Sequence, residues 1–165
     1  MEVTRILDLR QFDRFGRRFR DLVYKNSSRL PDEAATPDGH GGFSVFETSC
    51  ACGTLTDACV CQHIKQFYDT VAPQPCAFWT FDTDSFIPKP PNKEKIKAPE
   101  IVSVPSDTGD HCHRNVHNIS DNRLGKAFRR PETEHGLRLC FDGHAEAFTA
   151  DRAIELLHHH FPDPE

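Results

Sequence analysis

Four cysteines and one histidine fall between Cys50 and His63, in the stretch SCACGTLTDACVCQHIKQFYDTV of residues 49–71. Core packing alone does not account for so many thiol and imidazole groups in a polar stretch, because core side chains are mostly apolar. Such a cluster is typical of a metal site, a set of disulfides or a reactive-thiol centre. The choice among the three decides most of what the sequence can say about function.

The ends and composition of the chain favour metal ligands or free thiols over disulfides. The sequence starts with MEVTRILDLRQF, which lacks the apolar core of a signal peptide, and it has no apolar run long enough for a membrane span. We therefore expect an intracellular protein (cytoplasmic or nuclear), in which thiols stay reduced. The odd number of cysteines, seven, agrees with this expectation.

The preferred ligands form two close pairs, Cys50 with Cys52 and Cys61 with His63, and eight residues separate the pairs. Three thiolates and one imidazole are a standard tetrahedral set for structural zinc. Alternate residues of a strand share a face, so Cys50 and Cys52 can converge on one metal. Cys61 and His63 can do the same if Cys61 lies in the turn before a helix. Four protein ligands would leave no position for a catalytic water.

A CxC pair, a short gap and a CxH pair on a strand, turn and helix resemble the SWIM zinc finger. The resemblance covers about residues 42–72, where TSCACG matches the first half of the motif and VCQHIKQFY matches the second. It implies a ββα zinc module that contributes to DNA binding or protein–protein contact and has no chemistry of its own. The flanking segments do not indicate a parent family.

Cys59 makes a second ligand set conceivable within the same stretch. It has CxC spacing with Cys61, so that an all-cysteine site would use Cys50, Cys52, Cys59 and Cys61. His63 is preferred as the fourth ligand, because only six residues would separate the two pairs of the all-cysteine set. Cys59 would then be a buried or spare thiol.

The segment HCHRNVH is another candidate metal cluster, and its members are His111, Cys112, His113 and His117. His113 and His117 have the four-residue spacing of one helix face, but no glutamate follows His113 as in metalloprotease motifs. The alternatives are surface histidines, a second zinc site using Cys112 or Cys140, and a catalytic site.

Paired acids point to an enzyme as the competing class of function. Asp82 and Asp84 have the spacing that places two carboxylates on one strand face, as in magnesium sites for phosphoryl transfer. Asp142 could be a third acid of such a site. The alternative is that these acids have no metal-binding role and simply lie at strand ends and turns.

Another set of residues resembles the core of a restriction-type nuclease, namely Asp38, Glu47 and Lys65. In that core an acid precedes an (E/Q)xK pair, whereas His63 stands here in place of the acid or amide. The nuclease and zinc hypotheses exclude each other at His63, because each gives that side chain a different role.

Periodicity predicts helices over residues 5–25, over residues 62–71 and from the N-cap Thr149 onward. Residue types and alternation predict strands at residues 43–48, 76–87, 100–104 and 137–141. The polar segment 105–135 is expected to be rich in turns.

These patterns predict an α+β protein, in which a small ββα zinc module is accompanied by flanking helices and a few strands. The expected segments are an N-terminal helix and loop (1–41), the zinc finger (42–72) and a C-terminal strand and helix region (73–165). The net charge of −5 argues against a uniformly basic, nucleic-acid-binding surface. We expect zinc as the cofactor and a protein or DNA as the partner, with no membrane and no small-molecule substrate.

Overall fold

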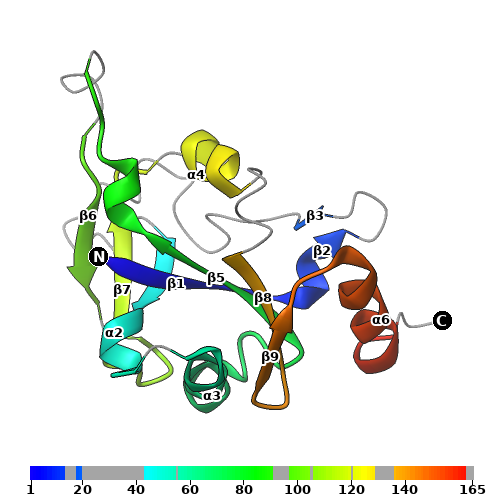
Figure 1. The fold of residues 1–165 in the computed structure, drawn as a ribbon. Coiled ribbons are helices and arrows are strands. Elements are labelled where there is room, and N and C mark those ends of the chain that lie inside the picture. Colours follow the sequence, from blue (N-terminus) through cyan, green and yellow to red (C-terminus); the bar gives the residue numbers. More distant parts are fainter. Residues whose placement is uncertain are drawn as a thin grey trace.

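A seven-stranded antiparallel sheet organises the part of the chain that the computed structural model describes (Figure 1). The described residues are 1–13, 18–19, 43–54, 56–90, 97–104, 106–119, 121–128 and 136–162. The sheet consists, in its spatial order, of β6 (Glu100–Ser103), β7 (His113–His117), β4 (Phe43–Glu47), β1 (Glu2–Leu7), β5 (Cys76–Asp82), β8 (Leu137–Phe141) and β9 (His144–Ala147). The α+β class is therefore confirmed, but the structure is sheet-rich where the sequence predicted a small ββα unit.

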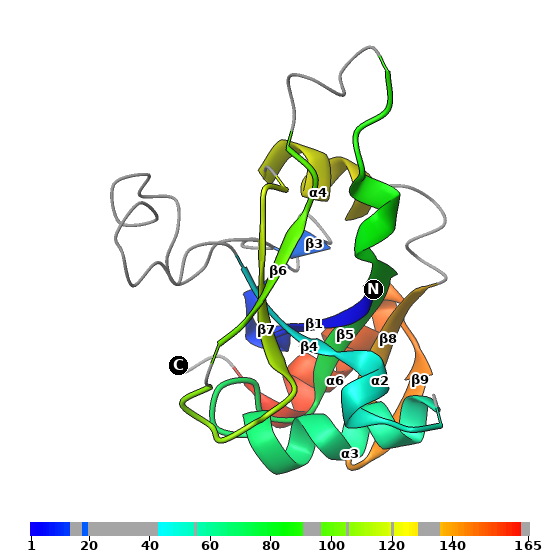
Figure 2. The same ribbon diagram turned by 90° about the vertical axis from the view of Figure 1, so that its left-hand side faces the viewer.

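Helices and a short hairpin cover the sheet. The helices are α2 (Thr48–Ala51), α3 (Asp57–Tyr68), α4 (Asp121–Phe128) and α6 (Ala150–His160), with the 3-10 turns η1 (Leu9–Gln11) and η2 (Thr83–Phe86). The hairpin consists of β2 (Phe12–Asp13) and β3 (Arg18–Phe19). Figure 2 shows α2 and α3 together near one end of the sheet, with α4 at the opposite end. None of the helices in the described residues is long and apolar enough to cross a membrane.

Two apolar clusters share the sheet, because successive side chains of a strand point to opposite faces. In β5, Phe78 joins the cluster under α3, while Trp79 and Phe81 join the larger cluster with α4 and α6. The rings of Trp79 and Phe81 stack with their centroids 4.4 Å apart. Both faces of this strand are thus buried, whereas the alternation of residues 76–87 predicted a half-buried strand.

The helix predicted over residues 5–25 is wrong where the structure describes it. The segment instead forms β1, η1 and the β2–β3 hairpin, while residues 14–17 and 20–25 lie outside the described residues. Central pairing explains the difference, because β1 hydrogen-bonds to β4 on one side and β5 on the other. The apolar residues that repeat at helical spacing are buried all the same, as Phe12 and Phe19 show.

The four predicted strands are present, and so is the last helix. The strands appear as β4, β5, β6 and β8, but the strand predicted over residues 76–87 ends at Asp82, before the 3-10 turn η2. Thr149 caps α6 by accepting a hydrogen bond from the Arg152 amide at 3.2 Å. The turn-rich interpretation of residues 105–135 is incomplete, because this segment also contains β7 and α4. The sheet draws strands from all three segments predicted along the chain.

The second predicted helix begins earlier than expected, at Asp57 instead of Gln62. Thr56 starts it, because its hydroxyl oxygen accepts a hydrogen bond from the Cys59 amide at 3.2 Å. Both Cys61 and His63 therefore lie well inside α3, and neither occupies the turn before it. This shift decides where the two side chains point.

We expect loss of the α3 cap to destabilise the fold modestly. Thr56→Ala should lower the free energy of unfolding by about 1 kcal/mol, because the Cys59 amide loses its acceptor. Thr56→Ser keeps a hydroxyl at the cap and should retain most of the stability. Urea unfolding followed by circular dichroism measures both variants, and equal losses would contradict the capping role.

Candidate metal centre

Six of the seven cysteines are joined in three disulfides, whereas the sequence favoured metal ligands or free thiols. Cys50–Cys112 connects α2 to the residue before β7, and Cys61–Cys140 connects α3 to β8. Cys52–Cys59 closes a short loop between α2 and α3. The seventh cysteine, Cys76, is free and buried. Apart from Cys50, these cysteines belong to or border the apolar cluster beneath α3.

The structure does not bring the four predicted ligands together, since Cys50, Cys52 and Cys61 each bind a different sulfur. Cys61 and His63 diverge because residues two apart in a helix do not share a face. Cys61 bonds to Cys140 of β8, and the fourth predicted ligand, His63, contacts Asp110. Of the all-cysteine alternative, Cys52 and Cys59 do meet, as a disulfide. Zinc at the predicted four residues stays a prediction for the thiol form of the chain.

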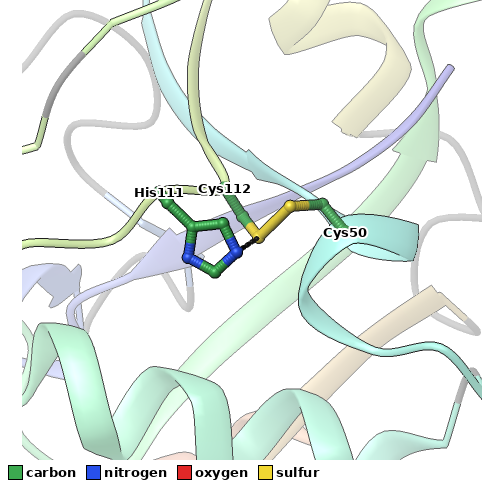
Figure 3. A group of neighbouring side chains, drawn as sticks. All are labelled: Cys50, His111 and Cys112. Atoms are coloured by element: carbon green, nitrogen blue, oxygen red, sulfur yellow. Dashed lines mark hydrogen bonds between the residues drawn. A yellow bond between two sulfur atoms is a disulfide. The ribbon is translucent and has the colours of Figure 1, made fainter.

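A different group of residues with metal-ligand atom types lies together, made of Cys50, His111 and Cys112 (Figure 3). One ligand atom from each residue lies within 4.8 Å of the other two. His111 Nε2 is 3.5 Å from Cys112 Sγ, which the structure joins to Cys50 Sγ. Cys50 and His111 are exposed, whereas Cys112 is fully buried. We call these three residues the Cys50 group.

The pairing of β4 with β7 positions the Cys50 group. Phe46 of β4 is opposite His113 of β7, so Glu47, the last residue of β4, meets Cys112, the residue that precedes β7. The Glu47 amide continues the ladder by donating to the Cys112 carbonyl at 2.9 Å. Cys50 follows within the single turn of α2, 62 residues before Cys112. The sequence shows both halves of the group but not this pairing.

The atoms of the Cys50 group are close enough to share one metal ion. Their ligand atoms lie within 4.8 Å of one another, although the two sulfurs are bonded and would have to separate to bind a metal side by side. Reduction of the disulfide would give two thiolates and one imidazole, which are ligands that suit zinc. A sulfur in a disulfide is no such ligand, so metal binding requires the thiol form. Three protein ligands fill three of the four tetrahedral positions.

A buried carboxylate, Asp110, holds the segment before the Cys50 group against α3. Its Oδ2 accepts a hydrogen bond from Tyr68 and lies 2.9 Å from His63 Nε2. Its Oδ1 accepts one from the Cys112 amide at 2.9 Å. Burial by itself would raise the pKa of Asp110, but the hydrogen bonds from Tyr68, His63 and Cys112 outweigh burial and lower that pKa below its usual value. Asp110 is thus held as a carboxylate, and the loop is fixed beside Cys112.

His63 is packed as a core side chain. Its ring lies 4.7 Å from that of Phe46 and 4.9 Å from that of Phe67, between ring centroids. Burial, followed by the bond to Asp110, raises the pKa of Tyr68 above the usual tyrosine value, so the phenol stays protonated and donates. These contacts give His63 a structural role in the core. The aromatic residues at the end of α3 are the part of the sequence that could have indicated this role.

The other histidines of the HCHRNVH segment have separate positions. His113 Nδ1 bonds to the Val104 carbonyl at 2.9 Å, which requires the proton on Nδ1. His113 Nε2 is then the acceptor for the Ser44 hydroxyl. His117 ends β7, at the far end of the strand from Cys112. Within this segment, His111 and Cys112 alone belong to the Cys50 group.

The residues of the nuclease alternative have different partners. Glu47 forms an ion pair with Arg114 at 3.0 Å, and Lys65 lies 3.6 Å from Asp142. Asp38 lies outside the described residues. The described members of this set therefore bind other side chains and do not converge on one another.

The paired acids Asp82 and Asp84 both contact the amino group of Met1, at 3.0 and 3.5 Å. Asp82 ends β5, and Asp84 lies in η2, so the two do not share a strand face as expected. Asp82 Oδ1 also accepts from the Asp84 amide at 2.9 Å, which caps the 3-10 turn. The pair acts here as a turn cap and an ion-pair site.

Comparison with known proteins gives no match to this chain. No protein-family model matches it, and neither a curated protein nor a solved structure does.

Replacing the buried carboxylate should destabilise the fold in a pH-dependent way. Asp110→Asn should cost roughly 3 kcal/mol at neutral pH, because a buried charge with three hydrogen bonds is lost. The lowered pKa means that this stabilisation is present above the unfolded value of about 3.9 and is lost as pH falls through the folded pKa. The deficit of the variant should therefore shrink in acid.

Urea unfolding of the wild type and Asp110→Asn, at neutral pH and in acid, measures this difference. Tyr68→Phe is the matched control, because it removes one donor and keeps the carboxylate. An equal deficit of Asp110→Asn at both pH values would contradict the role of the carboxylate charge.

The free thiol should be inert in the folded chain. Burial, together with the carboxylates of Asp8 and Asp69, raises the pKa of Cys76 to about 12, so its reactive thiolate is scarce at neutral pH. Iodoacetamide should leave the native, unreduced protein unlabelled and should add one group per chain after unfolding in guanidinium. Intact mass spectrometry counts the groups. Labelling of all seven cysteines without reductant would contradict the three disulfides.

Proposed function

We propose that this chain is a zinc-binding module that acts through contact with a protein partner and not through chemistry of its own. In this proposal Cys50, His111 and Cys112 hold the metal once the two sulfurs are reduced. The observation that carries the proposal is the approach of their ligand atoms, within 4.8 Å of one another, at the surface.

The donor types favour zinc over other common metals. Thiolates are soft ligands and imidazole is borderline, whereas magnesium and calcium select oxygen donors. Two thiolates also neutralise the charge of a divalent ion, so that the metal need not recruit an acid. Cys112 anchors the group to the sheet, because it is buried and its amide is bound by Asp110.

In this proposal, the protein partner supplies the fourth ligand of the metal. Cys50 and His111 are exposed, so a metal between them would face solvent on one side. A cysteine, histidine or acid of another protein could then complete the coordination. This arrangement agrees with the interaction role that the SWIM resemblance implies, although it uses a different ligand set from Cys50, Cys52, Cys61 and His63.

A protein partner is favoured over DNA by the charges of the described residues. The chain has a net charge of −5. Several described arginines are neutralised within the fold, where they pair with acids: Arg10 with Asp8, Arg114 with Glu47, Arg138 with Asp57 and Arg152 with Glu146. A nucleic-acid surface needs basic side chains that are available to phosphates.

The reduced protein should bind one zinc per chain through the Cys50 group. Elemental analysis of protein prepared with reductant and equilibrated with zinc should show the metal lost in Cys112→Ser and His111→Ala. Cys52→Ser and His63→Ala are the matched controls and should retain it. Loss of zinc in Cys52→Ser and His63→Ala, with zinc retained in Cys112→Ser and His111→Ala, would favour the SWIM ligand set. Absence of zinc from the reduced wild type would overturn the proposal.

The cobalt form should report an open fourth position. Cobalt in place of zinc should show thiolate-to-metal absorption, and added imidazole should shift the visible bands by entering the vacant position. An unchanged spectrum at saturating imidazole would mean that the chain itself supplies the fourth ligand. That result would contradict a partner-supplied ligand while leaving zinc binding intact.

A further inference from the structure

We propose that Cys50–Cys112 is a redox-active disulfide that exchanges with dithiol reductants, and that the disulfide and the zinc site are alternative states of the same three residues. The zinc half rests on the proposed function, and the exchange half does not. The substrate class is a small or protein dithiol, such as the vicinal thiols of a reducing protein.

Access to sulfur distinguishes this disulfide from the others. Exchange requires a thiolate to reach one sulfur of the bond. Cys50 is an exposed residue, and this exposure is what an incoming thiolate needs to approach the bond from solvent. Cys61 and Cys140 both have no exposed surface, and their bond lies in the apolar cluster beneath α3.

The third disulfide is intermediate in access. Cys52 is almost completely buried, and Cys59 is half-buried on α3. Its thiols would also stay close after reduction, because only seven positions separate them. Rapid reclosure therefore protects Cys52–Cys59 in a way that does not apply to Cys50–Cys112.

Loop length does not explain a difference between Cys50–Cys112 and Cys61–Cys140. Their sequence separations are 62 and 79 residues, so the two bonds restrain the unfolded chain by nearly the same entropy. A difference in their rates of reduction in the folded protein would therefore report access. Cys61–Cys140 is thus a matched internal control.

The position of His111 favours departure of Cys112. The attacking thiolate would form a mixed disulfide with Cys50, and Cys112 would leave as a thiolate. His111 Nε2, 3.5 Å from Cys112 Sγ, is placed to hydrogen-bond to that sulfur (Figure 3). The Asp110 loop keeps Cys112 in place, through its bond to the Cys112 amide.

The dithiol supplies all the electrons and protons that the exchange requires. The first thiol of the dithiol breaks the Cys50–Cys112 bond, and its second thiol then displaces Cys50 from the mixed disulfide. Two electrons and two protons pass to the protein, which gains two thiols, while the dithiol becomes a disulfide. Zinc binding to the two thiols and His111 then releases two protons, and an oxidised dithiol reverses the sequence and frees the metal.

The test is a time course of the native protein with dithiothreitol, with equimolar zinc present in one series. Acid quenching, alkylation and peptide mass mapping identify the cysteines released at each time. We expect Cys50 and Cys112 to be labelled at least tenfold faster than Cys61 and Cys140. Zinc uptake should follow this first event, and oxidised dithiothreitol in excess should release the metal to a chromophoric chelator.

A pair of variants tests His111 separately. His111→Ala should slow release of Cys50 and Cys112 several-fold and should abolish zinc uptake, while keeping the order of reduction. His117→Ala, at the other end of β7, is the control and should match the wild type.

The outcomes separate the two proposals. Simultaneous reduction of all three disulfides, or earlier reduction of Cys61–Cys140, would overturn the redox-active disulfide, whether or not the fully reduced chain binds zinc. Selective reduction of Cys50–Cys112 without zinc uptake would support the exchange site and overturn the zinc-binding function. Zinc that stays bound after the Cys50–Cys112 bond re-forms would show that the two states are not alternatives.

Discussion

The antiparallel pairing of β4 with β7 is the constraint on which the cysteine–histidine site depends. Its register sets Phe46 against His113, and the Glu47 amide extends the ladder to the Cys112 carbonyl. This pairing places the turn of α2 against the residues that precede β7, although they are far apart in sequence. The Asp110 carboxylate then ties the same residues to α3. The geometry of the Cys50 group is therefore a product of the sheet and not of a local metal-binding loop.

The sequence predicted those elements whose signals are local. The aromatic alternation of residues 76–82 and the cap at Thr149 correspond to β5 and α6. The N-terminal helix failed because pairing on both sides of β1 outweighs a helical repeat of apolar residues. The hairpin of β8 and β9 was missed, although Asp142 and Gly143, with φ of 49° and 78°, form the two-residue turn that an Asp-Gly pair favours.

Sequence reasoning found the residues of the candidate site but not their grouping. Cys50 belonged to one predicted cluster, and His111 and Cys112 to another. Connectivity between cysteines cannot be deduced from spacing, because it depends on which strands are neighbours. The spacing of Cys61 and His63 indicates a shared metal only if the helix starts after Cys61. Thr56, six residues before Gln62, caps α3, so Cys61 and His63 both lie within the helix. Their side chains therefore point in different directions.

A disulfide and a zinc site make similar demands on the backbone here. Both need the sulfurs of Cys50 and Cys112 to approach from two elements that the sheet already holds together, with Cα atoms 5.6 Å apart. The three ligand atoms lie within 4.8 Å of one another, although the two sulfurs are bonded in the disulfide and would separate in the proposed metal state. In the proposal, the choice between the two states depends on the reductant and the zinc that the surroundings supply. Because the same residues of α2 and of the segment before β7 would take part in both states, the proposed change of state would alter chiefly the exposed surface around Cys50 and His111.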